Sequence, residues 1–232
     1  KAIRRQRQMC IRDREYEAIV AQHSDFAGWI TIDGTKIDYP VMLTPNDGDY
    51  YLKRNVNGED DINGTLFMDP RTDLVQRSTN IIIYGHNMKN GSMFGHLKKF
   101  TEDEKLYNND RYFWILTPDK NYRYEIISAY TTGVNSDTYT LFKGPGEEFE
   151  EYLQKIKSYS DIKTEDTELT IKDKIVTLST CTGNESTRFV VQGKRVNAEG
   201  TGSGENTGSA DSDAASVDSV TCLLYTSDAA DE

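Results

Sequence analysis

The chain has 232 residues, and its 38 acidic residues outnumber the 27 basic ones to give a formal net charge of −11 at pH 7. Phosphate binding requires clustered lysine and arginine, so this balance argues against nucleic acid as a partner. No apolar run approaches the roughly 20 residues that a membrane-spanning helix needs.

The two ends of the chain resemble translated adapter DNA. Residues 9–14 read Met-Cys-Ile-Arg-Asp-Arg, and residues 222–226 read Cys-Leu-Leu-Tyr-Thr. The reverse complement of a DNA segment encoding the first peptide encodes the second in one frame. We therefore interpret 1–14 and 222–232 as adapter-derived artefacts and exclude them from fold reasoning.

This exclusion changes the charge and the cysteine count. Removing +5 at the start and −3 at the end takes the net charge from −11 to −13. Cys181 remains as the single cysteine, so no intrachain disulfide can form and its thiol becomes a candidate nucleophile. Residues 15–196 have the length of one domain. Residues 197–221 are dominated by small and polar types, which predicts a disordered tail.

The predicted elements in chain order are mostly short strands. Apolar periodicity and turn residues predict helices at 15–22, 94–100 and 147–159 and a turn with a short helix at 47–54. They predict strands at 29–32, 37–43, 64–68, 80–84, 111–116, 123–132, 174–181 and 188–196. Many short strands with helices only as insertions indicate a mainly β fold, a closed sheet or barrel.

A cysteine and an arginine flank one predicted hairpin loop. Residues 174–181 end on Cys181, and Arg188 begins the next strand seven residues later. A hairpin of that length places the two residues opposite each other. A thiolate is the nucleophilic form of cysteine, and a neighbouring cation favours it. Arg188 cannot act as an acid or base, so its expected role is that of a fixed donor to an oxyanion or a substrate backbone.

His86 is the third member of the predicted site. The apolar strand at 80–84 leads through Gly85 to this histidine. An imidazolium there would stabilise the thiolate and then protonate a departing amine. The other histidines, His23 and His96, have no comparable setting.

Each of these residues also has a plain structural interpretation. A cysteine at a strand end is most often a small buried hydrophobe, His86 alone could cap backbone carbonyls in a turn, and Arg188 alone could be a surface cation. Their shared position, where a strand meets a turn, favours a catalytic site. The acidic clusters at 47–49 and 59–61 lack the ligand spacing of a calcium loop, so we interpret them as solvated surface and expect no metal.

These motifs resemble those of class B sortases. Thr177-Leu178-Ser179-Thr180-Cys181 with Arg188 is similar to the sortase signature, and Tyr84-Gly85-His86-Asn87-Met88 resembles the class B histidine segment. The resemblance extends over most of 25–196. It also includes 37–41, 49–52, 64–69, 91–94 and the helix at 147–159, which matches an insertion between late strands of class B members.

The resemblance implies an eight-stranded sortase barrel and a cysteine transpeptidase without cofactor. His86, Cys181 and Arg188 fall on the family's catalytic positions, and Tyr84, Ser179 and Thr180 fall close to the substrate. The implied reaction cleaves a sorting-signal peptide after Thr and passes the acyl group from Cys181 to an amine of a peptidoglycan precursor. The implied location is the outer face of a Gram-positive membrane, although the family's membrane anchor is absent from this chain.

Two other functions fit the residues themselves. A cysteine protease would use water instead of an amine to release the acyl group. A catalytically silent barrel would bind cell-wall peptide with or without Cys181. The sequence leaves open the sorting motif, the acceptor and the anchored protein.

Overall fold

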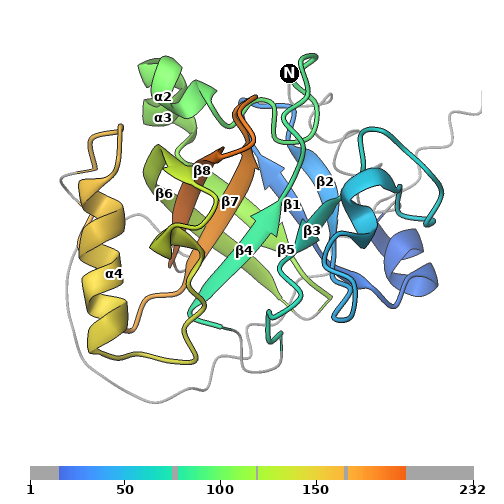
Figure 1. Ribbon diagram of the computed structural model, residues 1–232, viewed down its shortest axis with the longest axis horizontal. Helices are drawn as coiled ribbons and strands as arrows, with labels where there is room; N and C mark the ends of the chain where they lie inside the picture. The colour runs from blue at the N-terminus through green and yellow to red at the C-terminus, as the bar shows by residue number, and fades with distance from the viewer. Residues whose placement is uncertain (1–15, 75–77, 119, 165–166, 197–232) are drawn as a thin grey trace, which may run out of the picture.

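Eight strands form a closed barrel in the order β1-β2-β3-β4-β7-β8-β6-β5. This computed structural model describes residues 16–74, 78–118, 120–164 and 167–196 (Figure 1). The strands are β1 Phe26–Ile32, β2 Asp38–Met42, β3 Leu66–Met68, β4 Asn80–Tyr84, β5 Tyr112–Leu116, β6 Asn121–Gly133, β7 Ile175–Cys181 and β8 Thr187–Val196. The architecture is therefore the closed eight-stranded, mainly β barrel that the resemblance implied.

Two of the strand pairs are parallel, and one of them positions the site. β2 pairs in parallel with β3, and β4 pairs in parallel with β7, whereas the remaining neighbours are antiparallel. Every residue of β4 except Tyr84, and every residue of β7 except Cys181, is buried. Such continuous burial is expected for strands that are covered on both faces.

Side chains fill the barrel and two smaller clusters outside it. The barrel core includes Ile30, Leu66, Phe94, Phe113 and Val191, none of them exposed. The second cluster lies beneath α4 (Glu147–Ser158), which packs Phe149 and Leu153 outside the barrel (left in Figure 1). The third consists of Met42, Tyr51 and Phe67 and supports the 3-10 helix η1 (Tyr50–Lys53).

Helix α4 follows the pattern predicted for residues 147–159. Its four buried side chains, Phe149, Tyr152, Leu153 and Ile156, form the expected stripe. Acidic residues occupy its first turn and Lys155 and Lys157 its last, which complements the helix dipole. It ends at Ser158, one residue before the predicted boundary.

The segment at 94–100 differs from the predicted helix. Turns occupy residues 94–98, and the helix α2 covers only Lys99–Glu102. Phe94, Leu97 and Phe100 are all buried, and their three-residue spacing matches the i to i+3 bonds Leu97 N–Phe94 O and Phe100 N–Leu97 O. Tight 3-10-type turns repeat every three residues, and the prediction took this spacing for an α-helical one.

The helix α3 (Glu104–Asp110) has no counterpart in the prediction. Its N-cap is Asp103, whose carboxylate accepts from the backbone N–H groups of Lys105 and Leu106. Only Tyr107 is buried, so the helix lacks the apolar stripe from which such elements are recognised. Among the described residues, the remaining helical segments are residues 16–22 and the 3-10 helix η2 (Asp137–Tyr139).

The described part of the chain contains no helix of the length and apolarity that crossing a membrane requires. The predicted artefact segments 1–14 and 222–232 and the predicted tail 197–221 lie outside the described residues.

Candidate active site

Strand pairing brings the three predicted catalytic residues to one edge of the barrel. β4 and β7 are parallel, with Tyr84 beside Ser179, so their carboxyl ends lie together. β8 is antiparallel to β7, and Arg188 lies directly opposite Cys181. His86 follows the end of β4 by two residues. Residues more than 90 positions apart in the chain thus meet because of one parallel pair.

Hydrogen bonds join the histidine segment to the cysteine segment. The Gly85 N–H donates to the Ser179 carbonyl (3.1 Å), and the Thr180 hydroxyl donates to the Gly85 carbonyl (2.7 Å). The Asn87 side-chain amide donates to the Cys181 carbonyl (2.8 Å). The backbone positions on either side of His86 are therefore tied to the strand end that carries Cys181.

The Leu52 carbonyl holds the ring of His86. His86 Nε2 lies 2.6 Å from Leu52 O, and a carbonyl can only accept, so Nε2 carries a proton. Leu52 belongs to η1, which packs through Tyr51 on Met42 and Phe67. The 3-10 helix η1, which is not part of the barrel, thus fixes the orientation of the His86 ring and the proton on its Nε2.

Cys181 and Arg188 lie at the loop end of the hairpin that β7 and β8 form. Cys181 is exposed, which excludes the interpretation as a buried hydrophobe. Arg188 is half-buried, and its Nη1 donates to the carbonyls of Glu185 (3.0 Å) and Thr187 (2.9 Å). Gly183 has a φ of 94°, the left-handed conformation that the loop needs and that glycine adopts without strain.

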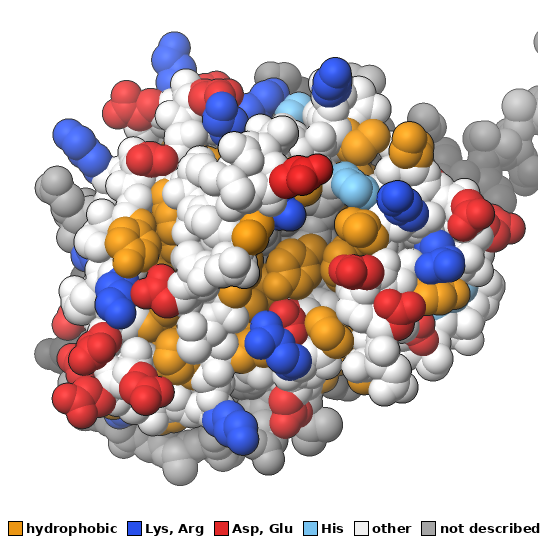
Figure 2. Space-filling model, in the orientation of Figure 1, with side chains coloured by type: hydrophobic (Ala, Val, Ile, Leu, Met, Phe, Trp, Pro, Cys, Tyr) orange, Lys and Arg blue, Asp and Glu red, His pale blue; other side chains and the backbone are white. Residues whose placement is uncertain are grey.

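All six predicted site residues line one groove of about 710 Å³. They are Tyr84, His86, Ser179, Thr180, Cys181 and Arg188. The other lining residues, to which the sequence analysis assigned no site role, are Asn46, Asp47, Gly48, Asp49, Leu52, Phe67, Asp69, Pro70 and Gly85. This face of the molecule is hollowed near its centre, with hydrophobic side chains on the floor and charged ones around it (Figure 2).

The hydroxyl groups of the two predicted substrate-binding residues on β7 form hydrogen bonds to other groups of the protein. Ser179 Oγ and the Tyr139 hydroxyl are 2.9 Å apart, and Thr180 is almost fully buried with its hydroxyl on Gly85. The pKa of Tyr139 is raised above its ordinary value, mainly by burial. The hydrogen bond with Ser179 and the charge of Arg188 act to lower this pKa, and Cys181 acts to raise it. Tyr139 therefore lies within electrostatic range of both ends of the hairpin.

Asp69 anchors a second set of groove residues. Its carboxylate accepts from Arg71 Nε and Nη2 (2.8 Å each) and from the Tyr84 hydroxyl (3.1 Å). Burial acts to raise the pKa of Asp69, but the hydrogen bonds and charge of Arg71 outweigh it and hold that pKa below its usual range. The Tyr84 ring also stacks near Tyr139, with centroids 6.3 Å apart. Tyr84 is thereby held from two sides.

Sequence reasoning missed Leu52, Asn87, Tyr139 and Asp69. Leu52, Asp69 and Asn87 lay within segments already quoted for the resemblance. Nothing in their residue types indicated the contacts to His86, Tyr84 and Cys181. Tyr139 and Asp69 contribute through partners 40 and 15 residues away in the chain. No local pattern encodes such contacts.

The described residues contain no group of three or more His, Cys, Asp or Glu side chains placed to hold a metal ion. His96 lies away from the groove lining and accepts the Lys36 N–H at Nδ1 (3.2 Å).

Comparisons with known proteins agree with this fold. The family described as Sortase domain matches residues 30–196. Sortase B of Listeria monocytogenes is 40% identical over 181 residues, covering 75% of this chain and 71% of that protein. Sortase B of Staphylococcus aureus is 30% identical over 181 residues, covering 76% and 72%.

Solved structures are similar over the same region. Sortase B from B. anthracis in complex with AAEK1 superposes with a TM-score of 0.70 at 40% identity, covering 78% of this chain and 83% of that one. The Staphylococcus aureus sortase B–substrate complex gives a TM-score of 0.74 at 27% identity, covering 83% and 92%. The chain therefore belongs to the sortase family. Its relatives place it in class B, and its activity is that of a cysteine transpeptidase that acts on sorting-signal peptides and cell-wall precursors.

Proposed function

We propose that Cys181, His86 and Arg188 carry out the transpeptidation. The observation that supports this is their convergence: three side chains of the types the chemistry requires line one groove at the end of a parallel strand pair. Cys181 is exposed and lines that groove, where a ligand can reach its thiol.

The reaction begins when Cys181 Sγ attacks the scissile carbonyl of the bound peptide. The tetrahedral intermediate collapses to a thioester, and the leaving amine takes a proton from the His86 imidazolium. Because Nε2 donates to Leu52 O, Nδ1 is the nitrogen that loses and regains this proton. The acceptor amine then attacks the thioester, gives its proton to His86 Nδ1 and releases the Cys181 thiolate.

Arg188 stabilises the negative charge on the carbonyl oxygen in both tetrahedral intermediates. It is always protonated, so it contributes as a donor and not as an acid. Its two bonds to the carbonyls of Glu185 and Thr187 hold the guanidinium in place before substrate arrives. Donors fixed in this way lose little energy to reorganisation, and removing one typically costs on the order of 10²–10³ in rate.

The substrate is a sorting-signal peptide cleaved after Thr, and the acceptor is an amine of a peptidoglycan precursor. Tyr84 and the β7 residues Ser179 and Thr180 form the floor near the cleaved bond. The enzyme works on the outer face of a Gram-positive membrane, where both the secreted protein and the precursor are present. The similarity to a sortase B solved with its substrate supports a peptide in this groove.

The test uses residues 15–221 and the same chain with Cys181→Ala. Both are incubated with quenched sorting-signal peptides that differ at each motif position, while intact-protein mass is recorded. We expect cleavage after Thr together with a covalent adduct that requires Cys181, and an added amine should divert the product from hydrolysis to transfer.

Two results would count against the proposal. No adduct with any peptide, from folded protein whose Cys181 still reacts with an alkylating agent, would indicate a binding module. Turnover whose products never include the added amine would indicate a protease.

A further inference from the structure

The pairing of β4 with β7 stops short of the catalytic residues. The last paired residues are Tyr84 and Ser179, and one more backbone bond follows, from the Gly85 N–H to the Ser179 carbonyl. His86 and Cys181 both lie beyond this point in the chain. The backbone ladder between β4 and β7 therefore brings the two strand ends together, but it does not itself fix the distance between the histidine and the cysteine.

Side chains take the place of the next bonds of this ladder. In a parallel pair the backbone bonds are evenly spaced along both strands, so the Gly85 carbonyl and then the Cys181 carbonyl are the next acceptors after that of Ser179. The Gly85 carbonyl accepts from the Thr180 hydroxyl (2.7 Å), and the Cys181 carbonyl accepts from the side-chain amide of Asn87 (2.8 Å). His86 thus lies between two side-chain bonds that join its segment to β7.

The backbone of Asn87 is engaged in a turn that faces away from β7. Asn87 forms an antiparallel bridge with Met93, and the Phe94 N–H donates to the His86 carbonyl (2.9 Å). Phe94 is fully buried in the barrel core. After β4 the chain therefore turns back on itself, and the side chain of Asn87 reaches across to Cys181.

Contacts among the described residues hold His86 on different sides. The buried Phe94 holds its backbone, and the Leu52 carbonyl holds its ring. These two contacts fix the histidine relative to the barrel core and to η1. The Asn87 bond differs from them because it ends on the residue that carries the thiol.

We infer that Asn87 is a positioning residue, whose bond to the Cys181 carbonyl sets the separation of His86 from the thiol. The inference rests on the proposed function for the roles of those two residues. Asn87 directly follows His86 in the chain, so a shift of the Asn87 side chain would move the histidine backbone with it. A displacement of about 1 Å in a catalytic site can cost on the order of 10²-fold in rate.

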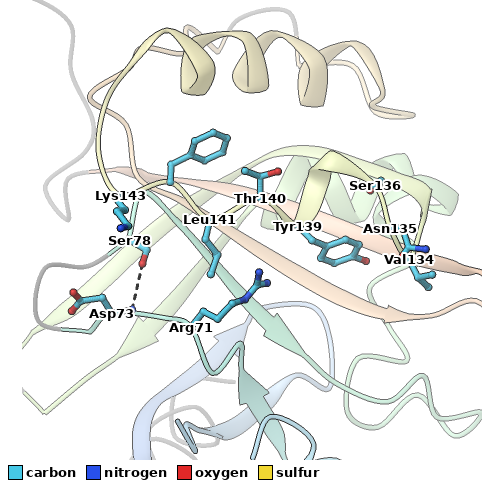
Figure 3. A pocket seen from close by; sticks show the side chains of 11 residues that line it. Arg71, Asp73, Ser78, Val134, Asn135, Ser136, Tyr139, Thr140, Leu141 and Lys143 are labelled. Atoms are coloured by element: carbon cyan, nitrogen blue, oxygen red, sulfur yellow. Dashed lines mark hydrogen bonds between the residues drawn. The ribbon is translucent and has the colours of Figure 1, made fainter. Parts of the chain in front are cut away.

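The surroundings of Asn87 suit positioning better than contact with substrate. Asn87 lines neither the catalytic groove nor the neighbouring cavity of about 920 Å³, whose wall includes Arg71 and Leu141 (Figure 3). Because a carbonyl can only accept, the Asn87 amide presents its NH₂ group to Cys181. An amide does not titrate, so the bond is the same whether His86 is neutral or protonated. Loss of the bond should therefore change kcat and leave KM nearly unaltered.

The experiment places one substitution at two sites of the same loop. Asn87→Asp removes the donor, because a carboxylate can only accept. Asn90→Asp is the matched control, since the side-chain oxygen of Asn90 accepts from the Ser92 N–H (2.9 Å) and the Ser92 hydroxyl (2.6 Å), and a carboxylate retains both bonds. Asn87 and Asn90 are both exposed, and each variant adds one negative charge.

Two further variants separate the added charge from the missing donor. Asn87→Leu has a side chain of similar size with neither charge nor donor, and Asn87→Gln keeps the amide on a longer side chain. Steady-state kinetics with the best-cleaved peptide of the panel give kcat and KM. We expect kcat to fall about tenfold or more in Asn87→Asp and Asn87→Leu, with KM within about twofold. Asn87→Gln should stay within about threefold of the unsubstituted chain, and Asn90→Asp within about twofold.

A second measurement requires no peptide. Alkylation of Cys181 by iodoacetamide at pH 7 is followed by intact-protein mass. A neighbouring imidazolium favours the reactive thiolate, so alkylation should slow by about threefold or more in Asn87→Asp and Asn87→Leu but not in Asn90→Asp. A hydrogen bond that water can replace adds little to stability, so the melting temperatures should agree within about 2 °C.

The outcomes separate this inference from the proposed function. The inference would be overturned by kcat and alkylation rates of Asn87→Leu within about twofold of the unsubstituted chain, by equal losses in Asn87→Asp and Asn90→Asp, or by an effect on KM alone. If the unsubstituted chain cleaved no peptide, the proposed function would fail. Slower alkylation confined to Asn87→Asp and Asn87→Leu would then still support the positioning role.

Discussion

At the scale of single residues, the site depends on side chains whose partners fix them before substrate binds. The ring of His86 is held by a backbone carbonyl, the guanidinium of Arg188 by two more, and the hydroxyl of Tyr84 by a buried carboxylate. Preorganisation of this kind matters because donors and acids that are already placed need not reorganise during the reaction.

Arg188→Lys tests the role of the guanidinium. Lysine keeps the positive charge, but a point charge cannot bond two carbonyls and an oxyanion in a fixed plane. We expect kcat/KM to fall by about 10²-fold or more with little change in melting temperature. Steady-state cleavage of the best panel peptide measures this, and near-normal turnover would contradict the assigned role.

Asp69→Asn tests the carboxylate that holds Arg71 and Tyr84. The amide retains an acceptor but loses the charge, so we expect a loss of about 1–2 kcal/mol in the free energy of unfolding at pH 7. Because the folded-state pKa of Asp69 lies below its usual range, this stabilisation is complete above the unfolded pKa of about 3.9 and is lost as pH falls through the folded value.

Urea unfolding of both proteins from pH 7 to pH 3 measures that dependence. The difference between them should stay constant above about pH 5 and shrink below about pH 4. A difference that does not change with pH would show that the carboxylate charge contributes nothing.

At the scale of elements, the turn after β4 is as constrained as the strands. A Cβ at Gly85 would collide with Leu66 Cδ2 and would lie 2.8 Å from Phe94 Cδ2, and both of these side chains are fully buried. Glycine at this position therefore lets the chain approach the core immediately before His86. The same packing that fills the barrel thus sets where the histidine emerges.

Gly85→Ala, with Gly193→Ala as its control, separates this local effect from general destabilisation. A Cβ at Gly193 would meet the Phe113 ring at 2.5 Å, inside the barrel and away from the groove lining. Both substitutions should cost about 1–3 kcal/mol of stability through overpacking. Only Gly85→Ala should also lower kcat/KM by tenfold or more, because small displacements of a catalytic group are costly. Equal activity losses would contradict a specific role of the turn.

A buried polar network ties the site strands to α4. The Tyr152 hydroxyl accepts from Asn80 of β4 and Gln192 of β8 and donates to the Thr138 carbonyl. Thr177 of β7 bonds to both Asn80 and Gln192. The strands β4, β7 and β8, which position His86, Cys181 and Arg188, are therefore linked to one another and to the helix outside them.

At the scale of the whole molecule, the barrel and its two outer clusters contain most of the buried apolar side chains of the described residues. Trimming the chain to 15–196 should therefore leave the melting temperature within about 2 °C of that of the full chain, since it removes none of these contacts. Differential scanning calorimetry of both chains measures this. A large fall on trimming would show that the ends are part of the fold.

Comparison of sequence and structure shows which elements can be predicted from short stretches of the sequence. Alternation and apolar runs predicted all eight strands and α4 within a few residues, because burial on a sheet or helix face imposes its period on the chain. The segment at 94–100 was misassigned because a three-residue turn repeat resembles a helical one, and α3 was missed because it buries only Tyr107.

The sequence by itself determined the pairing of Cys181 with Arg188, since a short hairpin loop fixes its own register. Only the tertiary structure decided that His86 joins them, through the parallel pairing of β4 with β7. It alone also placed the Leu52 carbonyl on His86 and formed the cavity beside Arg71. A backbone carbonyl has no sequence signature, and a cavity depends on surfaces brought together from distant parts of the chain.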